Sequence, residues 1–178
     1  MRKIFFVAAL SALLFACSDK KEKTDAAGTG DQKDKMAPAD LPYTARYSDL
    51  TQDVSDADLK AVLESYKVWE AGDMTKVPAY YSDTVYWERN NGDKKAWSNA
   101  DLMKEWTTFR DSLSSVVVKF DAWDKVNSPS MKENYILTWY KEYDTYKSGK
   151  VDSAEYHDIN QVKDGKIAVF SQYRRTLK

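Results

Sequence analysis

The sequence predicts an α+β domain in which a cone-shaped, strongly curved and mostly antiparallel sheet is covered by three N-terminal helices. Three observations support this prediction. Helical patterns come before most of the strand-like runs. The last four runs are about 11 to 14 residues long, so they would extend about 36–48 Å and must curl to fit a small domain. Finally, Asp164-Gly165 joins the last two runs as a two-residue hairpin loop.

The N-terminal segment 1–17 has the pattern of a signal peptide. Its apolar run from Ile4 to Phe15 is shorter than the roughly 20 residues that span a bilayer. The ending LFAC resembles the lipobox of bacterial lipoproteins, which implies that Cys17 is lipidated and begins the mature chain. We therefore expect a lipid-anchored protein of the bacterial cell envelope, at the outer membrane. The alternative is a secreted protein in which Cys17 has no such role.

A tether is predicted at 18–52, ahead of a folded domain at 53–178. Up to about Pro42 this segment is rich in Lys, Asp, Glu, Gly, Ala, Thr and Pro and has hardly a large apolar residue. Such a composition cannot bury enough surface to offset the entropy of ordering, so we expect disorder. Acidic residues alternate with the lysines, which favours a solvated linker over a segment that binds anionic lipid head groups.

Charge and residue counts exclude several classes of function. The chain has 27 basic and 28 acidic residues, and removal of Arg2 and Lys3 with the signal peptide leaves 25 basic residues and a net charge of −3. Nucleic acid is therefore not an expected partner. Cys17 is the single cysteine and His157 the single histidine, so disulfides, a cysteine nucleophile and paired-histidine zinc sites are excluded. We predict no metal site and no cofactor, since serine-hydrolase, nucleotide-binding and calcium-binding motifs are absent.

The first predicted helix begins after Ser55 and ends at Gly72. Ser55 and Asp58 form a capping box, and glycine is a common residue just beyond a helix C-terminus. Apolar residues between them recur at helical spacing, namely Leu59, Val62, Leu63, Tyr66 and Trp69. We expect this face to pack against the sheet.

A second, short helical piece is predicted from Asp73 through Tyr81, followed by a strand at Thr84–Glu88 and a turn at Asn91-Gly92. A third helix begins after Ser98, with Asp101 completing a second capping box. Its apolar stripe is Leu102, Met103, Trp106, Phe109 and Leu113. Four strands follow, at Val116–Val126, Glu133–Tyr146, Val151–Lys163 and Lys166–Thr176.

The Asp-Gly loop predicts the register of the last hairpin, in which paired residue numbers add to 329. Val162 then faces Ile167, Tyr156 faces Tyr173, and His157 faces Gln172. Strict alternation places Tyr156, Asp158 and Tyr173 on one face and His157 on the other. On the strand Val116–Val126, the same alternation points Asp124 inward.

This order of elements resembles the nuclear transport factor 2-like, or SnoaL-like, fold. The similarity is carried by AGDMTKVPAYYSDTVYWE at 71–88 and VKDGKIAVFSQY at 162–173, and it extends over Asp53 to Lys178. The resemblance implies the cone-shaped fold. It also implies a range of activities: isomerases, dehydratases, cyclases and epoxide hydrolases that act on apolar small molecules, and domains that only bind or assemble. Many members associate through the sheet, so a homodimer of that kind is one expectation.

Enzymes of this family commonly place an aspartate, sometimes with histidine or tyrosine, inside the cone, although no motif here matches closely enough to transfer a residue. From the residues themselves, the candidate catalytic groups are His157, Asp158 and Asp124. Each has a structural alternative as an ordinary strand residue. The candidate pocket residues are Trp87, Trp106, Trp139 and Tyr173, whose rings either line a cavity or fill the core and a dimer contact.

Two functions follow from these patterns. The first is a lipid-anchored domain that binds a small apolar or aromatic ligand or a protein partner. The alternative is a cofactor-free isomerase, lyase or cyclase that uses an inward carboxylate or His157 as acid or base. A purely structural dimerisation domain is a third hypothesis.

Overall fold

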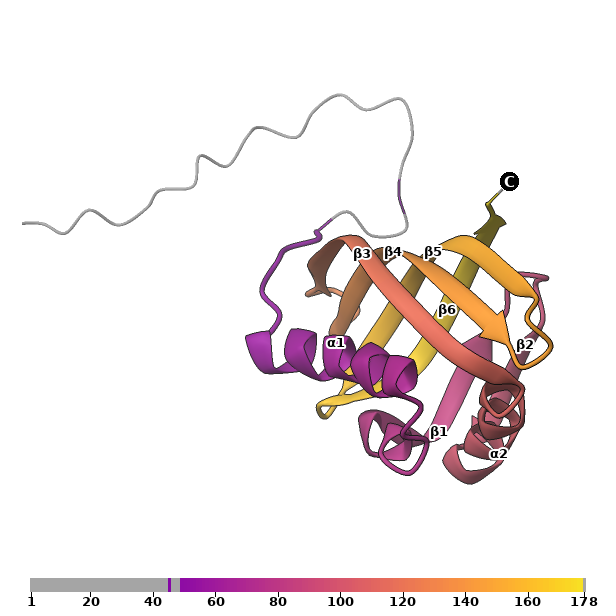
Figure 1. Cartoon of the computed structure of the whole chain (residues 1–178). Helices are drawn as coiled ribbons and strands as arrows, with labels where there is room; N and C mark the ends of the chain where they lie inside the picture. Colours follow the sequence, from indigo (N-terminus) through magenta and orange to yellow (C-terminus); the bar gives the residue numbers. More distant parts are fainter. Residues whose placement is uncertain (1–44, 46–48, 178) are drawn as a thin grey trace, which may run out of the picture. The chain divides into compact units, whose positions relative to one another are not determined.

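The computed structural model describes residue 45 and residues 49–177 (Figure 1). The predicted signal peptide, the lipidation site Cys17 and most of the tether lie outside the described residues. Among the described residues, no helix is long and apolar enough to cross a membrane.

The described elements follow the predicted order, except that the strand Lys94–Ser98 was not predicted. They are α1 (Asp56–Ala71), the 3-10 helix η1 (Val77–Tyr80), β1 (Tyr81–Glu88), β2 (Lys94–Ser98), α2 (Asn99–Arg110), β3 (Leu113–Ser128), β4 (Glu133–Tyr146), β5 (Val151–Lys163) and β6 (Lys166–Thr176). The second predicted helix is thus only one short 3-10 turn, and two α-helices are found where three helices were expected. Leu113 belongs to β3 and not to the stripe of the preceding helix.

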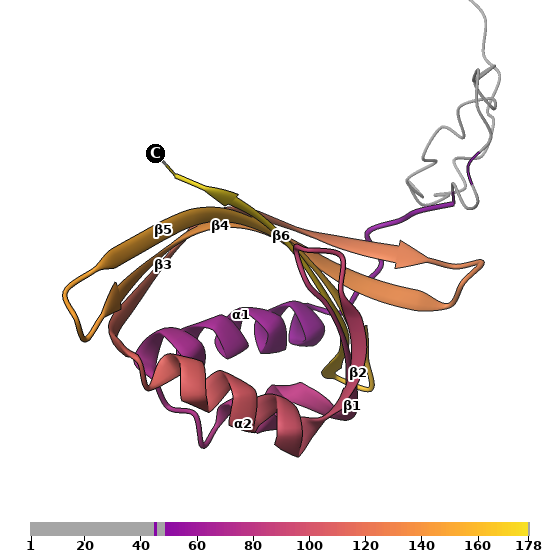
Figure 2. The same ribbon diagram turned by 90° about the vertical axis from the view of Figure 1, so that its right-hand side faces the viewer.

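Six strands form one mixed, open sheet in the order β2-β1-β6-β5-β4-β3. The β1–β6 contact is parallel and the other four are antiparallel. Figure 2 shows the sheet curling over α1, with α2 on the same side. The sheet therefore has a concave face toward the helices and an outer face, which confirms the predicted α+β fold class.

Both α-helices begin at the predicted caps. Ser55 Oγ accepts a hydrogen bond from the Asp58 amide at 3.0 Å, and Ser98 Oγ accepts one from the Asp101 amide at 3.1 Å. α1 ends at Gly72, which adopts the left-handed conformation with φ of 76°. The local signals in the sequence are sufficient to set these ends because capping involves only neighbouring residues.

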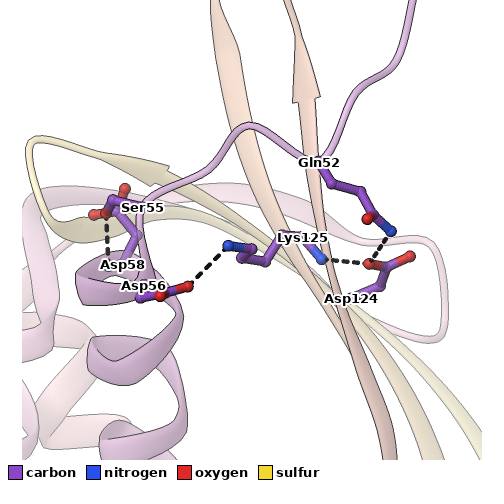
Figure 3. Close-up of polar contacts among 6 residues, drawn as sticks. All are labelled: Gln52, Ser55, Asp56, Asp58, Asp124 and Lys125. Carbon is purple, nitrogen blue, oxygen red and sulfur yellow. Dashed lines mark hydrogen bonds and ion pairs between the residues drawn. The ribbon is translucent and has the colours of Figure 1, made fainter. Parts of the chain in front are cut away.

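A β-bulge in β3 reverses the predicted orientation of Asp124. Phe120 pairs with Tyr140 but Ala122 pairs with Trp139, so one residue is passed over and the alternation shifts. Lys125 now lies opposite the buried Ile136, on the concave face, and its ammonium binds Asp56 of α1 at 2.8 Å (Figure 3). Asp124 instead accepts a hydrogen bond from Gln52 at 3.0 Å (Figure 3). The prediction that Asp124 points inward was wrong.

A second bulge changes the register of the last hairpin. Val162 pairs with Ile167 as predicted, but Gln161 pairs with Val169, so Ala168 is passed over. From there on paired residue numbers add to 330, and His157 lies opposite Tyr173, not Gln172. Tyr173 consequently moves to the outer face of the sheet. The predicted pairing of Tyr156 with Tyr173 is wrong for the same reason.

The end of the predicted tether contacts the domain. Thr51 forms an antiparallel bridge with Asn127 of β3, and the Asp49 carboxylate accepts a hydrogen bond from the Ser130 amide at 2.7 Å. Val54 is buried in the core. Residues 49 and 51, which lie in the predicted tether, thus contact β3 and the turn after it.

Candidate functional site

A cavity of about 350 Å³ lies on the concave side of the sheet. Its walls come from α1, η1, β1, α2, β4, β5 and β6, and most of its lining is aromatic. The lining rings are Tyr66, Trp69, Tyr81, Trp87, Trp106, Phe109, Tyr140, Tyr156 and Phe170. Such a volume, enclosed mainly by apolar side chains, is typical of a small-molecule site.

Trp106 of α2 is the ring that joins the helices to the strands. Its ring meets those of Tyr81 and Trp87 edge to face, at centroid distances of 5.1 and 5.6 Å. The Arg89 guanidinium lies 4.1 Å from the ring centroid of Trp87 and pairs with Glu105 at 3.3 Å. Arg89 and Glu105 therefore supply a charged, more exposed part of the lining.

The inward face of β4 supplies the polar side of the site. Alternation along this strand points Ile136, Thr138, Tyr140, Glu142 and Asp144 toward the helices, and all five are buried. Glu142 lines the cavity while leaving only 8% of its surface exposed. Burial, together with the nearby charges of Asp144 and Asp158, raises the pKa of Glu142 to about 8. This side chain can therefore carry a proton near neutral pH.

Asp158 of β5 lies deeper, behind two tyrosines. Its Oδ2 atom accepts hydrogen bonds from the hydroxyls of Tyr66 at 2.7 Å and Tyr140 at 2.8 Å. The residue is fully buried, and this desolvation raises the pKa of its carboxyl to about 7, although hydrogen bonds from the two tyrosines and from Gln172 oppose the rise. Both tyrosines line the cavity, whereas Asp158 does not. Asp158 therefore interacts with a molecule in the cavity only through the two tyrosine hydroxyls.

Two of the four predicted pocket rings, Trp87 and Trp106, line the cavity. Trp139 and Tyr173 do not, because odd-numbered residues of β4 and the shifted β6 register place them on the outer face. There they stack on either side of His157, with ring centroids 4.6 Å and 6.0 Å from the imidazole. The expectation that these two rings line the pocket is corrected.

The three predicted catalytic candidates do not come together. Asp158 is inside the fold, whereas His157 faces outward and its Nδ1 atom lies 3.1 Å from the Thr138 carbonyl oxygen. Asp124 is held near the N-terminal segment by Gln52. Of the three, only Asp158 adjoins the lining of the cavity, through Tyr66 and Tyr140.

Sequence reasoning missed Glu142 as a candidate. The signal that could have found it is alternation from Ile136 through Tyr140 to Glu142 and Asp144. This signal is weak because the opposite face of β4 also carries rings, at Tyr135, Trp139 and Tyr143. Within the part of the chain that the structure describes, no three His, Cys, Asp or Glu side chains are grouped to hold a metal ion.

Comparison with known proteins finds similarity at the level of structure alone. The amino-acid sequence matches no protein-family model and no curated protein. Among solved structures, AusH from Aspergillus nidulans aligns with a TM-score of 0.56 at 14% identity, over 70% of this chain and 88% of that one. An LEH-like epoxide hydrolase of M. tuberculosis aligns with a TM-score of 0.57 at 13% identity, over 67% of this chain and 83% of that one. An NTF2-like protein of unknown function from Burkholderia pseudomallei aligns with a TM-score of 0.53 at 14% identity, over 68% of this chain and 92% of that one.

Proposed function

We propose that this domain, which has the nuclear transport factor 2-like fold, binds a small, mainly apolar or aromatic molecule in the cavity lined by Trp87 and Trp106. The observation that carries the proposal is the combination of a volume of about 350 Å³ with a lining of converging rings. Rings provide a large apolar contact area, and a small number of polar groups then orient the ligand.

We further propose that the domain works at the bacterial cell envelope, anchored by lipid on Cys17. The support is the LFAC sequence after a short apolar run. Several acyl chains, each methylene contributing about 0.8 kcal/mol when buried, would anchor the protein stably. A homodimer through the outer face of the sheet also stays a proposal, supported by exposed rings at Trp139 and Tyr173.

The test of ligand binding compares three tryptophan-to-alanine variants. Trp87→Ala and Trp106→Ala remove cavity rings, while Trp139→Ala removes an equally large ring from the outer face. We measure the unfolding midpoint and the saturable binding of an apolar fluorescent probe for each. We expect the first two variants to weaken probe binding at least tenfold and Trp139→Ala to leave it unchanged. Absence of saturable binding to the unchanged protein would mean that the rings form only a packed core.

A second candidate function is proton transfer by a cofactor-free isomerase, lyase or cyclase. The observation that favours it is an acid, Glu142, in the same cavity lining as two tyrosines, Tyr66 and Tyr140. A carboxyl whose pKa is near neutral can give or take a proton, and tyrosine hydroxyls can stabilise an enolate oxygen. Exchange of the methyl protons of acetophenone in D₂O, followed by NMR, checks this. Exchange that is no faster than without protein, or that persists in Glu142→Gln, would contradict it.

A further inference from the structure

Three buried carboxyl groups lie on the concave side of β4 and β5, and one of them, Glu142, lines the cavity. Glu142, Asp144 and Asp158 are 8%, 5% and 0% exposed. Among residues 49–177, no lysine or arginine forms an ion pair with any of the three. The nearest arginines are engaged elsewhere: Arg110 donates to the carbonyl oxygens of Trp69 and Glu70, and Arg174 pairs with Asp152 at 2.7 Å. The concave side of these two strands therefore has an excess of acidic groups.

The remaining walls are built from rings that suit a cation. The face of an aromatic ring is electron-rich and attracts ammonium and guanidinium groups, most strongly for tryptophan. Trp87 already receives the guanidinium of Arg89 on one face at 4.1 Å. A second guanidinium, that of Arg174, lies 5.9 Å from the ring centroid of Tyr156. Among residues 49–177, no lysine or arginine lies over four other rings of the lining, of which Trp69 and Phe109 stack on each other: Trp69, Trp106, Phe109 and Phe170. Rings and the Glu142 side chain thus surround one volume, in which Glu142 supplies a buried carboxyl group.

We infer that the ligand of this cavity is a small organic cation, an ammonium group with apolar or aromatic substituents, whose charge lies against Glu142. The inference rests on the proposed ligand-binding function and names the chemical class of that ligand. An anion would meet the carboxyl groups and is disfavoured. A neutral ligand with a hydrogen-bond acceptor is the competing case, because it would accept the proton that Glu142 carries.

The two cases differ in how binding depends on pH. The charged, titratable and hydrogen-bonding groups that act on Glu142 come from four elements: Asp144 and Tyr140 on β4, Asp158 and Tyr156 on β5, Arg110 on α2 and Trp69 on α1. Asp152 and Arg174 act on the neighbouring Asp144. Burial and the two nearest carboxyls raise the pKa of Glu142 to about 8, and Arg110 and Trp69 only partly oppose them. A cation must displace that proton, so its affinity rises with pH, by up to about tenfold per unit, between about pH 5 and pH 8. A neutral acceptor needs the proton, so its affinity stays nearly constant between about pH 5 and pH 7 and falls only as the pH passes about 8.

The experiment uses the full chain and three probes of similar size. These are benzyltrimethylammonium as the cation, acetophenone as the neutral acceptor and phenylacetate as the anion, each titrated calorimetrically at pH 5, 6.5 and 8. Two variants are compared. Glu142→Gln removes the charge inside the cavity, and Glu155→Gln makes the same change on β5, where Glu155 is paired with Arg175.

We expect benzyltrimethylammonium to bind most tightly, to gain affinity as pH rises and to lose at least tenfold in Glu142→Gln but not in Glu155→Gln. If Glu142→Gln does not fold, the pH dependence of probe binding to the unchanged protein decides between a cationic and a neutral ligand. Binding of acetophenone in preference to the cation, or cation binding that ignores pH, overturns the inference and leaves the proposed ligand binding intact. If none of the probes, including the apolar fluorescent probe, saturates the protein, both proposals fail together.

Discussion

Replacing Asp158 by asparagine tests whether burial of this carboxyl destabilises the protein at neutral pH. The pKa of Asp158 is raised from 3.8 to about 7, so the folded protein keeps a proton that the unfolded chain loses above about pH 4. Unfolding then releases a proton, and stability falls as pH rises through this window. About three pKa units at about 1.4 kcal/mol each give a loss of about 4 kcal/mol, complete above about pH 7.

The amide introduced by Asp158→Asn would have no charge at any pH and would still offer one oxygen to Tyr66 and Tyr140. Whatever the amide costs in packing is independent of pH. We therefore expect Asp158→Asn to gain about 3 kcal/mol of unfolding free energy relative to the unchanged protein between pH 5 and pH 8. Urea unfolding at pH 5, 6, 7 and 8, extrapolated linearly to water, measures this difference.

Tyr140→Phe is the matched variant, in which the unfolding free energy should change in the opposite direction. It removes one donor to the Asp158 carboxylate, which should raise the pKa of Asp158 further because a hydrogen bond to the charged form is lost. This variant should lose more stability at pH 8 than at pH 5. If the difference between Asp158→Asn and the unchanged protein is the same at both pH values, the reasoning about Asp158 is refuted.

Two further predictions concern the helix end and the membrane anchor. Gly72→Ala should destabilise by about 1–2 kcal/mol in urea unfolding, because its φ is +76° and the new Cβ would lie 2.8 Å from Arg110 Nη2. Gly149→Ala has a similar φ of +85° with nothing within 4 Å, so an equal loss in both would show that the Arg110 contact is unimportant. Cys17→Ser should move the protein from the membrane to the soluble fraction after cell lysis, since the lipid can no longer be attached. Unchanged partition on immunoblots would rule out lipid anchoring through Cys17.

The parts of the fold that were predictable from sequence depend on local chemistry. Ser55 and Ser98 cap helices through bonds to residues three positions away, and turns at fixed positions set the ends of β4, β5 and β6. The bulges at Asp121 and Ala168 carry no comparable local signal. They satisfy packing between distant segments, such as the Lys125 contact with Asp56, and a one-residue shift then reverses every later side chain.

The candidate site was only half predictable for a related reason. Trp87 and Trp106 were found because rings on a short strand and on a helix stripe have an evident inward face. Trp139 was misplaced because both faces of β4 carry aromatic residues, so alternation does not indicate which is buried. Asp144 was one of several strand carboxylates in the sequence. It shares a face with Glu142 in any register, since the two are two residues apart on β4, but only the structure shows that this face is buried.

The two faces of the sheet differ in how their acidic side chains are paired. On the outer face, Asp121 is paired with Lys141 and Glu155 with Arg175. On the concave face, Glu142 and Asp158 form no ion pair with any lysine or arginine of residues 49–177, and their pKa values are raised. A carboxyl without a partner costs folding free energy wherever it is buried, and an apolar residue of similar size would remove that cost. Because Glu142 bears this cost at the cavity, the cost supports the proposal of a ligand that interacts with Glu142.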